Sequence, residues 1–71
     1  MDQYVKVTFP TGRQVMVDGV PAGLTNKVFQ VETGSHTFDL GPNGGYRPAT
    51  QTLKVTGTLP DRPMVITFKK T

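Results

Sequence analysis

The chain has 71 residues, no cysteine and a formal net charge of +3. Its length allows one small domain with a thin core, and packing alone must hold that core because neither disulfides nor a thiolate zinc site can form. The eight Lys and Arg residues are spread along the sequence, which disfavours a nucleic-acid partner, and no apolar run approaches the roughly 20 residues that span a bilayer, so we expect no direct membrane insertion.

The first part of the chain alternates apolar and polar residues with a period of two, which is typical of strands with one buried face. YVKVTF, residues 4–9, is predicted to be the first strand, and a Pro-Thr-Gly stretch ends it. QVMV, residues 14–17, is predicted to be the second, and Asp18-Gly19 supplies a turn signal after it. Residues 19–26 contain glycine and proline and are predicted to form a loop.

The remaining strands follow the same alternation. KVFQV, residues 27–31, and HTFDL, residues 36–40, are predicted to form a tight hairpin. The segment GPNGGYRP, residues 41–48, should be irregular because of its glycines and prolines. TQTLKV, residues 50–55, and MVITFK, residues 64–69, complete the set. No segment has a useful helical period, so we predict an all-β fold, a small antiparallel β-sandwich of about six strands.

A sandwich in which each strand reverses the direction of the previous one would place alternate connections at opposite ends. Residues 18–26 and 41–48 would then share one end, with residues 10–13, 32–35 and 56–63 at the other.

The first of these ends holds our candidate binding residues, Asn43, Tyr46 and Arg47, on a glycine-rich rim. Tyrosine and arginine are favoured at recognition sites, and a tyrosine face can stack on a sugar ring. For Tyr46 we favour packing on the core over ligand contact, because so short a domain lacks apolar volume.

The sequence offers little for catalysis. The one histidine, His36, is interpreted as a strand-edge imidazole that caps the hairpin or bonds a loop carbonyl, and Asp18 as a turn residue that bonds its local backbone. A lone histidine without a D-x-D-x-D loop makes no metal site, and neither a G-x-G-x-x-G nor a Walker motif occurs. We therefore predict no enzyme, no metal and no cofactor.

The order and spacing of the turn residues resembles the PEGA domain family. The similar stretches are VMVDGVPAGLT (residues 15–25), VETGSHTFDL (residues 31–40) and GGY (residues 44–46). Asn26 departs from the family, which usually has proline after the position of Thr25, and FPTGRQ replaces the motif that gives the family its name.

This resemblance implies a compact β-sandwich that acts as a non-catalytic accessory module in bacterial and archaeal envelope or surface proteins. We expect residues 1–71 to be one domain of a larger protein, monomeric by itself, whose partners are other domains of its parent or an envelope protein. The cell envelope or the extracellular space is the location that the family suggests. Two alternatives stay open: a glycan-binding module that uses residues 41–48, and a small basic nucleic-acid-binding β domain.

Overall fold

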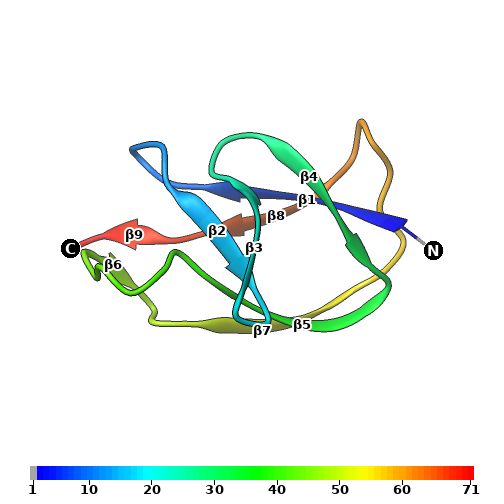
Figure 1. Ribbon diagram of the computed structural model, residues 1–71. Coiled ribbons are helices and arrows are strands. Elements are labelled where there is room, and N and C mark those ends of the chain that lie inside the picture. The colour runs from blue at the N-terminus through cyan, green and yellow to red at the C-terminus, as the bar shows by residue number, and fades with distance from the viewer. Residues whose placement is uncertain (1) are drawn as a thin grey trace.

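The computed structural model describes residues 2–71, which form strands and turns without a helix (Figure 1). The predicted all-β class is confirmed. In chain order the strands are β1 (Asp2–Thr8), β2 (Gln14–Val17), β3 (Val20–Leu24), β4 (Val28–Glu32), β5 (Gly34–Asp39), β6 (Tyr46–Arg47), β7 (Gln51–Val55), β8 (Met64–Thr67) and β9 (Lys69–Lys70). Residues 2–71 accordingly include no helix with the length and hydrophobicity that crossing a membrane requires.

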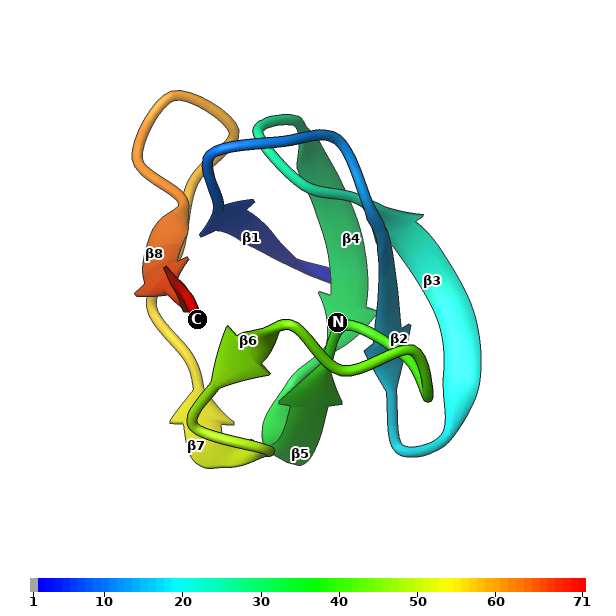
Figure 2. The ribbon, with the colours of Figure 1, turned by 90° about the vertical axis from the view of Figure 1, so that its left-hand side faces the viewer.

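Two sheets face each other, and a short third ladder lies at one end of the molecule (Figures 1 and 2). The first sheet has the strand order β4-β1-β8, the second β3-β2-β5-β7, and the third ladder pairs β6 with β9. The pairings are antiparallel except that of β1 with β8, which run parallel. The sheets of the predicted sandwich are thus mostly antiparallel, with more strands than the six expected.

The alternating apolar residues meet between the two sheets. Val5 and Val7 of β1 are fully buried on one side, as are Phe38 of β5 and Val55 of β7 on the other. Each such side chain contributes about 1.5–3 kcal/mol on burial. The buried apolar cluster comprises Val5, Val7, Phe9, Val15, Val17, Val31, Phe38, Leu40, Val55, Ile66 and Phe68. The inward faces predicted from the period of two are confirmed for these strands.

β3 lies where a loop was predicted over residues 19–26, so that part of the prediction is wrong. Pro21 is tolerated because β3 is an edge strand of its sheet, where a missing N–H breaks no ladder on the open side. Gly23 is required at its position because a Cβ there would lie 2.6 Å from Cγ of Phe29, whose ring covers the strand. Glycine and proline therefore serve the strand here instead of interrupting it.

β6 also lies inside a segment predicted to be irregular, residues 41–48. Tyr46 stands opposite Lys70 and Arg47 opposite Lys69 in its antiparallel ladder with β9. A two-residue strand has too few positions for an alternating pattern to reveal it.

The expected separation of residues 10–13 from residues 41–48 is wrong. The guanidinium of Arg13 donates hydrogen bonds to the carbonyl oxygens of Gly44 and Leu40, so these connections lie at the same end. The cause is β3, which adds a reversal of direction that simple alternation of six strands omits.

Residues 32–35 and 56–63 do share an end, as predicted, and Gln3 of β1 joins them. Its side-chain amide nitrogen donates to the Thr33 hydroxyl at 2.8 Å. Its side-chain oxygen accepts hydrogen bonds from the backbone N–H and the hydroxyl of Thr58, at 2.9 and 2.6 Å. Gln3 is 5% exposed, and these bonds satisfy its buried amide.

Asn26 fastens the connection between β3 and β4 to the end of β1. Its backbone N–H donates to the carbonyl oxygen of Val7 at 2.6 Å, and its φ is +65°. Its side chain bonds both backbone groups of Phe9, donating to the carbonyl oxygen at 2.9 Å and accepting from the N–H at 3.2 Å. Proline has no N–H and a fixed φ near −65°, so the proline usual in the family could not make this connection.

Candidate binding surface

Arg13 organises the segment that holds the predicted binding residues. One guanidinium nitrogen donates to the carbonyl oxygen of Gly44, and the other donates to that of Leu40 at 3.0 Å. The guanidinium carbon also lies 4.9 Å from the centre of the Tyr46 ring and 5.8 Å from that of Phe9. Sequence reasoning missed this role, because an arginine in a Pro-Thr-Gly-Arg turn is usually solvated and carries no mark of such distant carbonyl partners.

Tyr46 is half-buried and completes one end of the core. Its ring meets that of Phe68 edge to face, with centroids 5.6 Å apart and an interplanar angle of 83°. Its hydroxyl donates to the carbonyl oxygen of Gly41 at 2.8 Å. This is the packing role that the sequence favoured for Tyr46, and it leaves little of the ring for a ligand.

Asn43 and Arg47 are exposed and lie in different surroundings. Asn43 borders a mainly polar hollow of about 280 Å³, whose other lining residues are Arg13, Gln14, Met16, Leu40, Gly41 and Pro42. Arg47 borders neither this hollow nor the larger one described next, and instead stands opposite Lys69 in the β6–β9 ladder. The structure brings Tyr46 to Arg13 but does not gather the three predicted residues around one hollow.

A larger hollow of about 460 Å³ lies beside β9. Its lining residues are Thr8, Phe9, Pro10, Asn26, Thr67, Phe68, Lys69 and Lys70. Its exposed lining is more apolar than polar, and its only charged members are the two lysines. This surface therefore suits a partner that combines an apolar part with negative charge.

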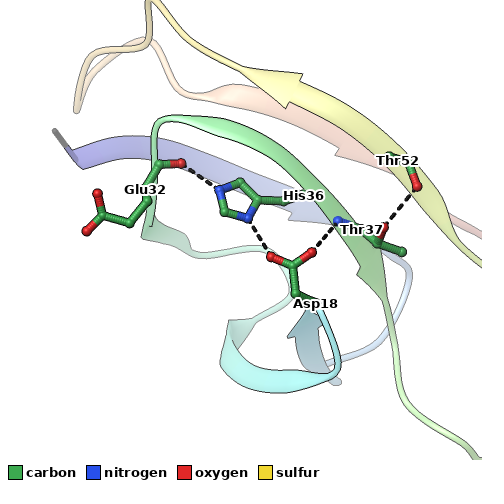
Figure 3. A network of polar contacts seen from close by, with 5 residues as sticks. All are labelled: Asp18, Glu32, His36, Thr37 and Thr52. Atoms are coloured by element: carbon green, nitrogen blue, oxygen red, sulfur yellow. Dashed lines mark hydrogen bonds and ion pairs between the residues drawn. The ribbon is translucent and has the colours of Figure 1, made fainter.

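A polar cluster ties the β2–β3 turn to β5 and to the end of β4 (Figure 3). The tight hairpin predicted for residues 27–31 and 36–40 is wrong, because the chain crosses from one sheet to the other after Glu32: β4 pairs with β1, whereas β5 pairs with β2 and β7. Nδ1 of His36 lies 2.6 Å from Oδ2 of Asp18, and Nε2 lies 2.6 Å from the backbone carbonyl oxygen of Glu32. The other carboxylate oxygen of Asp18 accepts from the N–H of Thr37 at 2.9 Å, and the Thr37 hydroxyl meets that of Thr52 at 3.0 Å. The carbonyl bond predicted for His36 is confirmed, whereas Asp18 contacts β5 across the sheet and not its own turn.

The geometry of this cluster calls for a protonated imidazole. A carbonyl oxygen and an ionised carboxylate only accept hydrogen bonds, so both ring nitrogens of His36 must donate. The hydrogen bond to Asp18, and next the one to the Glu32 carbonyl, raise the pKa of His36 above its ordinary value. The hydrogen bond from His36, and next that from the Thr37 N–H, lower the pKa of Asp18. His36 is 14% exposed and Asp18 51%, so solvent weakens their attraction.

Residues 2–71 place no three His, Cys, Asp or Glu side chains together for a metal ion. Both nitrogens of the one imidazole are engaged in the cluster just described. The imidazole of His36 therefore links two parts of the fold, the β2–β3 turn and the end of β4.

Comparison with known proteins yields one match. A family model described as PEGA domain matches residues 4–63. The same comparisons give no match to a curated protein and none to a solved structure. The matched range runs from within β1 to the residue before β8.

Proposed function

Because the chain belongs to the PEGA domain family of small non-catalytic β modules, we propose that it is an accessory interaction or spacer module of a larger, envelope-associated prokaryotic protein. The observation that carries the non-catalytic role is His36. A general base needs a ring nitrogen free to take a proton from a substrate, but both nitrogens here face fixed acceptors of the fold.

An interaction role is supported by apolar side chains on the outer face of the β4-β1-β8 sheet. Val28 and Val65 flank Lys6 in register, one from each neighbouring strand, and they are 45% and 60% exposed. Exposed apolar residues on one face of a sheet favour contact with another protein surface. Other domains of the parent chain or an envelope protein are the partners that we propose.

One observation favours the glycan-binding alternative, namely the polar hollow beside Asn43. Against it, no aromatic ring among residues 2–71 is fully exposed: Tyr4, Phe29 and Tyr46 are half-buried, and Phe9, Phe38 and Phe68 are buried. A sugar ring or a nucleic-acid base would find no fully exposed ring on which to stack.

Amide NMR titrations of the isotopically labelled chain test these roles. The additions are soluble cell-wall glycan fragments and a short single-stranded oligonucleotide, each at low and high salt. In parallel, the chain is cross-linked to solubilised envelope proteins, with excess unlabelled chain as competitor.

We expect competed cross-links and no saturable shifts with either ligand. Saturable shifts around residues 41–48 with glycan, persisting at high salt, would replace the proposal by the glycan-binding role. Shifts with oligonucleotide that are saturable and fall steeply with salt would replace it by nucleic-acid binding. Cross-links that the unlabelled chain does not compete would overturn the interaction role and leave a spacer.

A further inference from the structure

The larger hollow opens where the hydrogen-bonded pairing of β1 with β8 ends. The N–H of Phe68 still donates to the carbonyl oxygen of Thr8 at 3.2 Å, which extends the pairing of β1 with β8. Beyond it stands Pro10, which has no N–H to continue a ladder. The two segments of the chain therefore separate, and the hollow lies between residues 8–10 and β9.

β9 has an unpaired edge at this place. It belongs to a two-stranded ladder, so its one strand neighbour among residues 2–71 is β6. Its two residues, Lys69 and Lys70, also line the hollow. An open strand edge presents backbone N–H and C=O groups that an extended segment of another chain can pair with.

The charge beside this edge is uniformly positive. Arg47 stands opposite Lys69, so their side chains share one face of the ladder, and Lys70 shares the other face with Tyr46. Lys69, Lys70 and Arg47 are exposed, and none of them forms an ion pair within residues 2–71. Carboxylates at alternate positions of an added strand would all point to the face of Arg47 and Lys69.

We infer that the outer edge of β9 and the hollow beside it dock a short extended segment of a partner protein that carries carboxylates at alternate positions. This inference rests on the proposed interaction role and names the chemistry of the partner. Backbone pairing supplies affinity, the cations orient the segment, and apolar side chains at the intervening positions pack toward the Phe9 and Phe68 side of the hollow. β9 lies outside the range that the family model matches, so the inference depends on residues of this chain itself.

The test is an amide NMR titration of the chain with a short synthetic peptide that alternates glutamate and valine. We expect saturable shifts confined to residues 8–9, 45–47 and 67–71. The double variant Lys69→Glu/Lys70→Glu should bind at least tenfold more weakly. A matched control, Lys54→Glu/Arg62→Glu, carries the same change in net charge on exposed residues outside the hollow and should keep the affinity within about twofold.

Two control peptides separate strand pairing from charge attraction. A version with N-methylated backbone amides should not bind, since it cannot donate to the edge of β9. A version with lysine in place of glutamate should not bind either. Equal binding of the methylated peptide, equal losses in both double variants, or shifts absent from residues 67–71 would each overturn the inference.

Failure here is distinguishable from failure of the proposed function. A chain that gives competed cross-links to envelope proteins, but no shifts with the glutamate peptide, keeps its interaction role and loses this docking site. A chain that gives neither loses both.

Discussion

Replacing Asn26 is a direct test of how the β3–β4 connection is held. We consider the variants Asn26→Gly, Asn26→Ala and Asn26→Pro, which remove its contacts in steps. Glycine keeps the positive φ of 65° and the backbone N–H bond to Val7, but loses both side-chain bonds to Phe9. Alanine loses the same bonds and strains the left-handed backbone. Proline loses the N–H bond as well and cannot reach the φ at all.

The magnitudes follow from these contacts. A net hydrogen bond contributes about 0.5–1.5 kcal/mol, and partial exposure places both bonds to Phe9 toward the lower value, so Asn26→Gly should cost about 1–2 kcal/mol. A left-handed conformation without glycine costs alanine a further ~1 kcal/mol. Asn26→Pro should cost about 3 kcal/mol or more, a large part of the stability of so small a domain.

Urea denaturation and thermal melting measure this series. In a domain of this size, 1 kcal/mol lowers the Tm by roughly 4–8 °C, so the three variants should be well separated. Lys27→Ala, one residue along and exposed, is the matched control and should change stability by less than about 0.5 kcal/mol. An Asn26→Pro variant as stable as the parent, or an alanine variant more stable than the glycine variant, would refute the reasoning.

Three further predictions concern other contacts. The raised pKa of His36 and the lowered pKa of Asp18 mean that their pairing stabilises the fold fully between the ordinary values of 3.8 and 6.5. This stabilisation should be lost as the pH rises through the raised pKa of His36 and as it falls through the lowered pKa of Asp18. Urea denaturation measured against pH should show both losses, and His36→Gln should reduce them. An unchanged profile in this variant would contradict the pairing. Gly23→Ala should destabilise by about 1–3 kcal/mol, because its Cβ meets the Phe29 ring. In a Phe29→Ala chain, which lacks the Cγ and Cδ1 atoms that this Cβ meets, the same substitution should cost less; full tolerance of Gly23→Ala in the parent by denaturation would exclude the close approach. Arg13→Ala should broaden the amide NMR signals of residues 41–45, because the two guanidinium hydrogen bonds to this segment are lost. Arg13→Lys should not restore sharp signals, since an ammonium cannot replace the planar guanidinium that bonds both carbonyl oxygens. Sharp signals in both variants would show that other contacts hold the segment.

The core could be predicted from the sequence because burial in a strand depends on local alternation. Val5, Val7 and Phe38 lie inward as their spacing indicates. β3 could not, because Pro21 and Gly23 signal a loop unless the edge position of the strand and the Phe29 ring are known.

The candidate site was predictable only in part. Tyr46 could be assigned to the core from the shortage of apolar volume, and the structure packs it on Phe68. The partners of Arg13 and Asp18 could not be predicted, because they lie 27 and 18 residues away, at Leu40 and His36, and no local pattern encodes such distances.

The parallel pairing of β1 with β8 has a mechanical consequence. The start of β1 and the strand β9 lie at opposite ends of a molecule 32 Å long (Figure 1). Tension applied between neighbouring domains would pull β1 and β8 in opposite directions along their common axis. The ladder from Val5–Met64 to Thr8–Thr67 would then carry the force as shear, with its hydrogen bonds loaded together instead of opening one after another. Resistance to forced unfolding depends on the unfolding rate under load, so a chain of modest equilibrium stability can still transmit tension through this ladder.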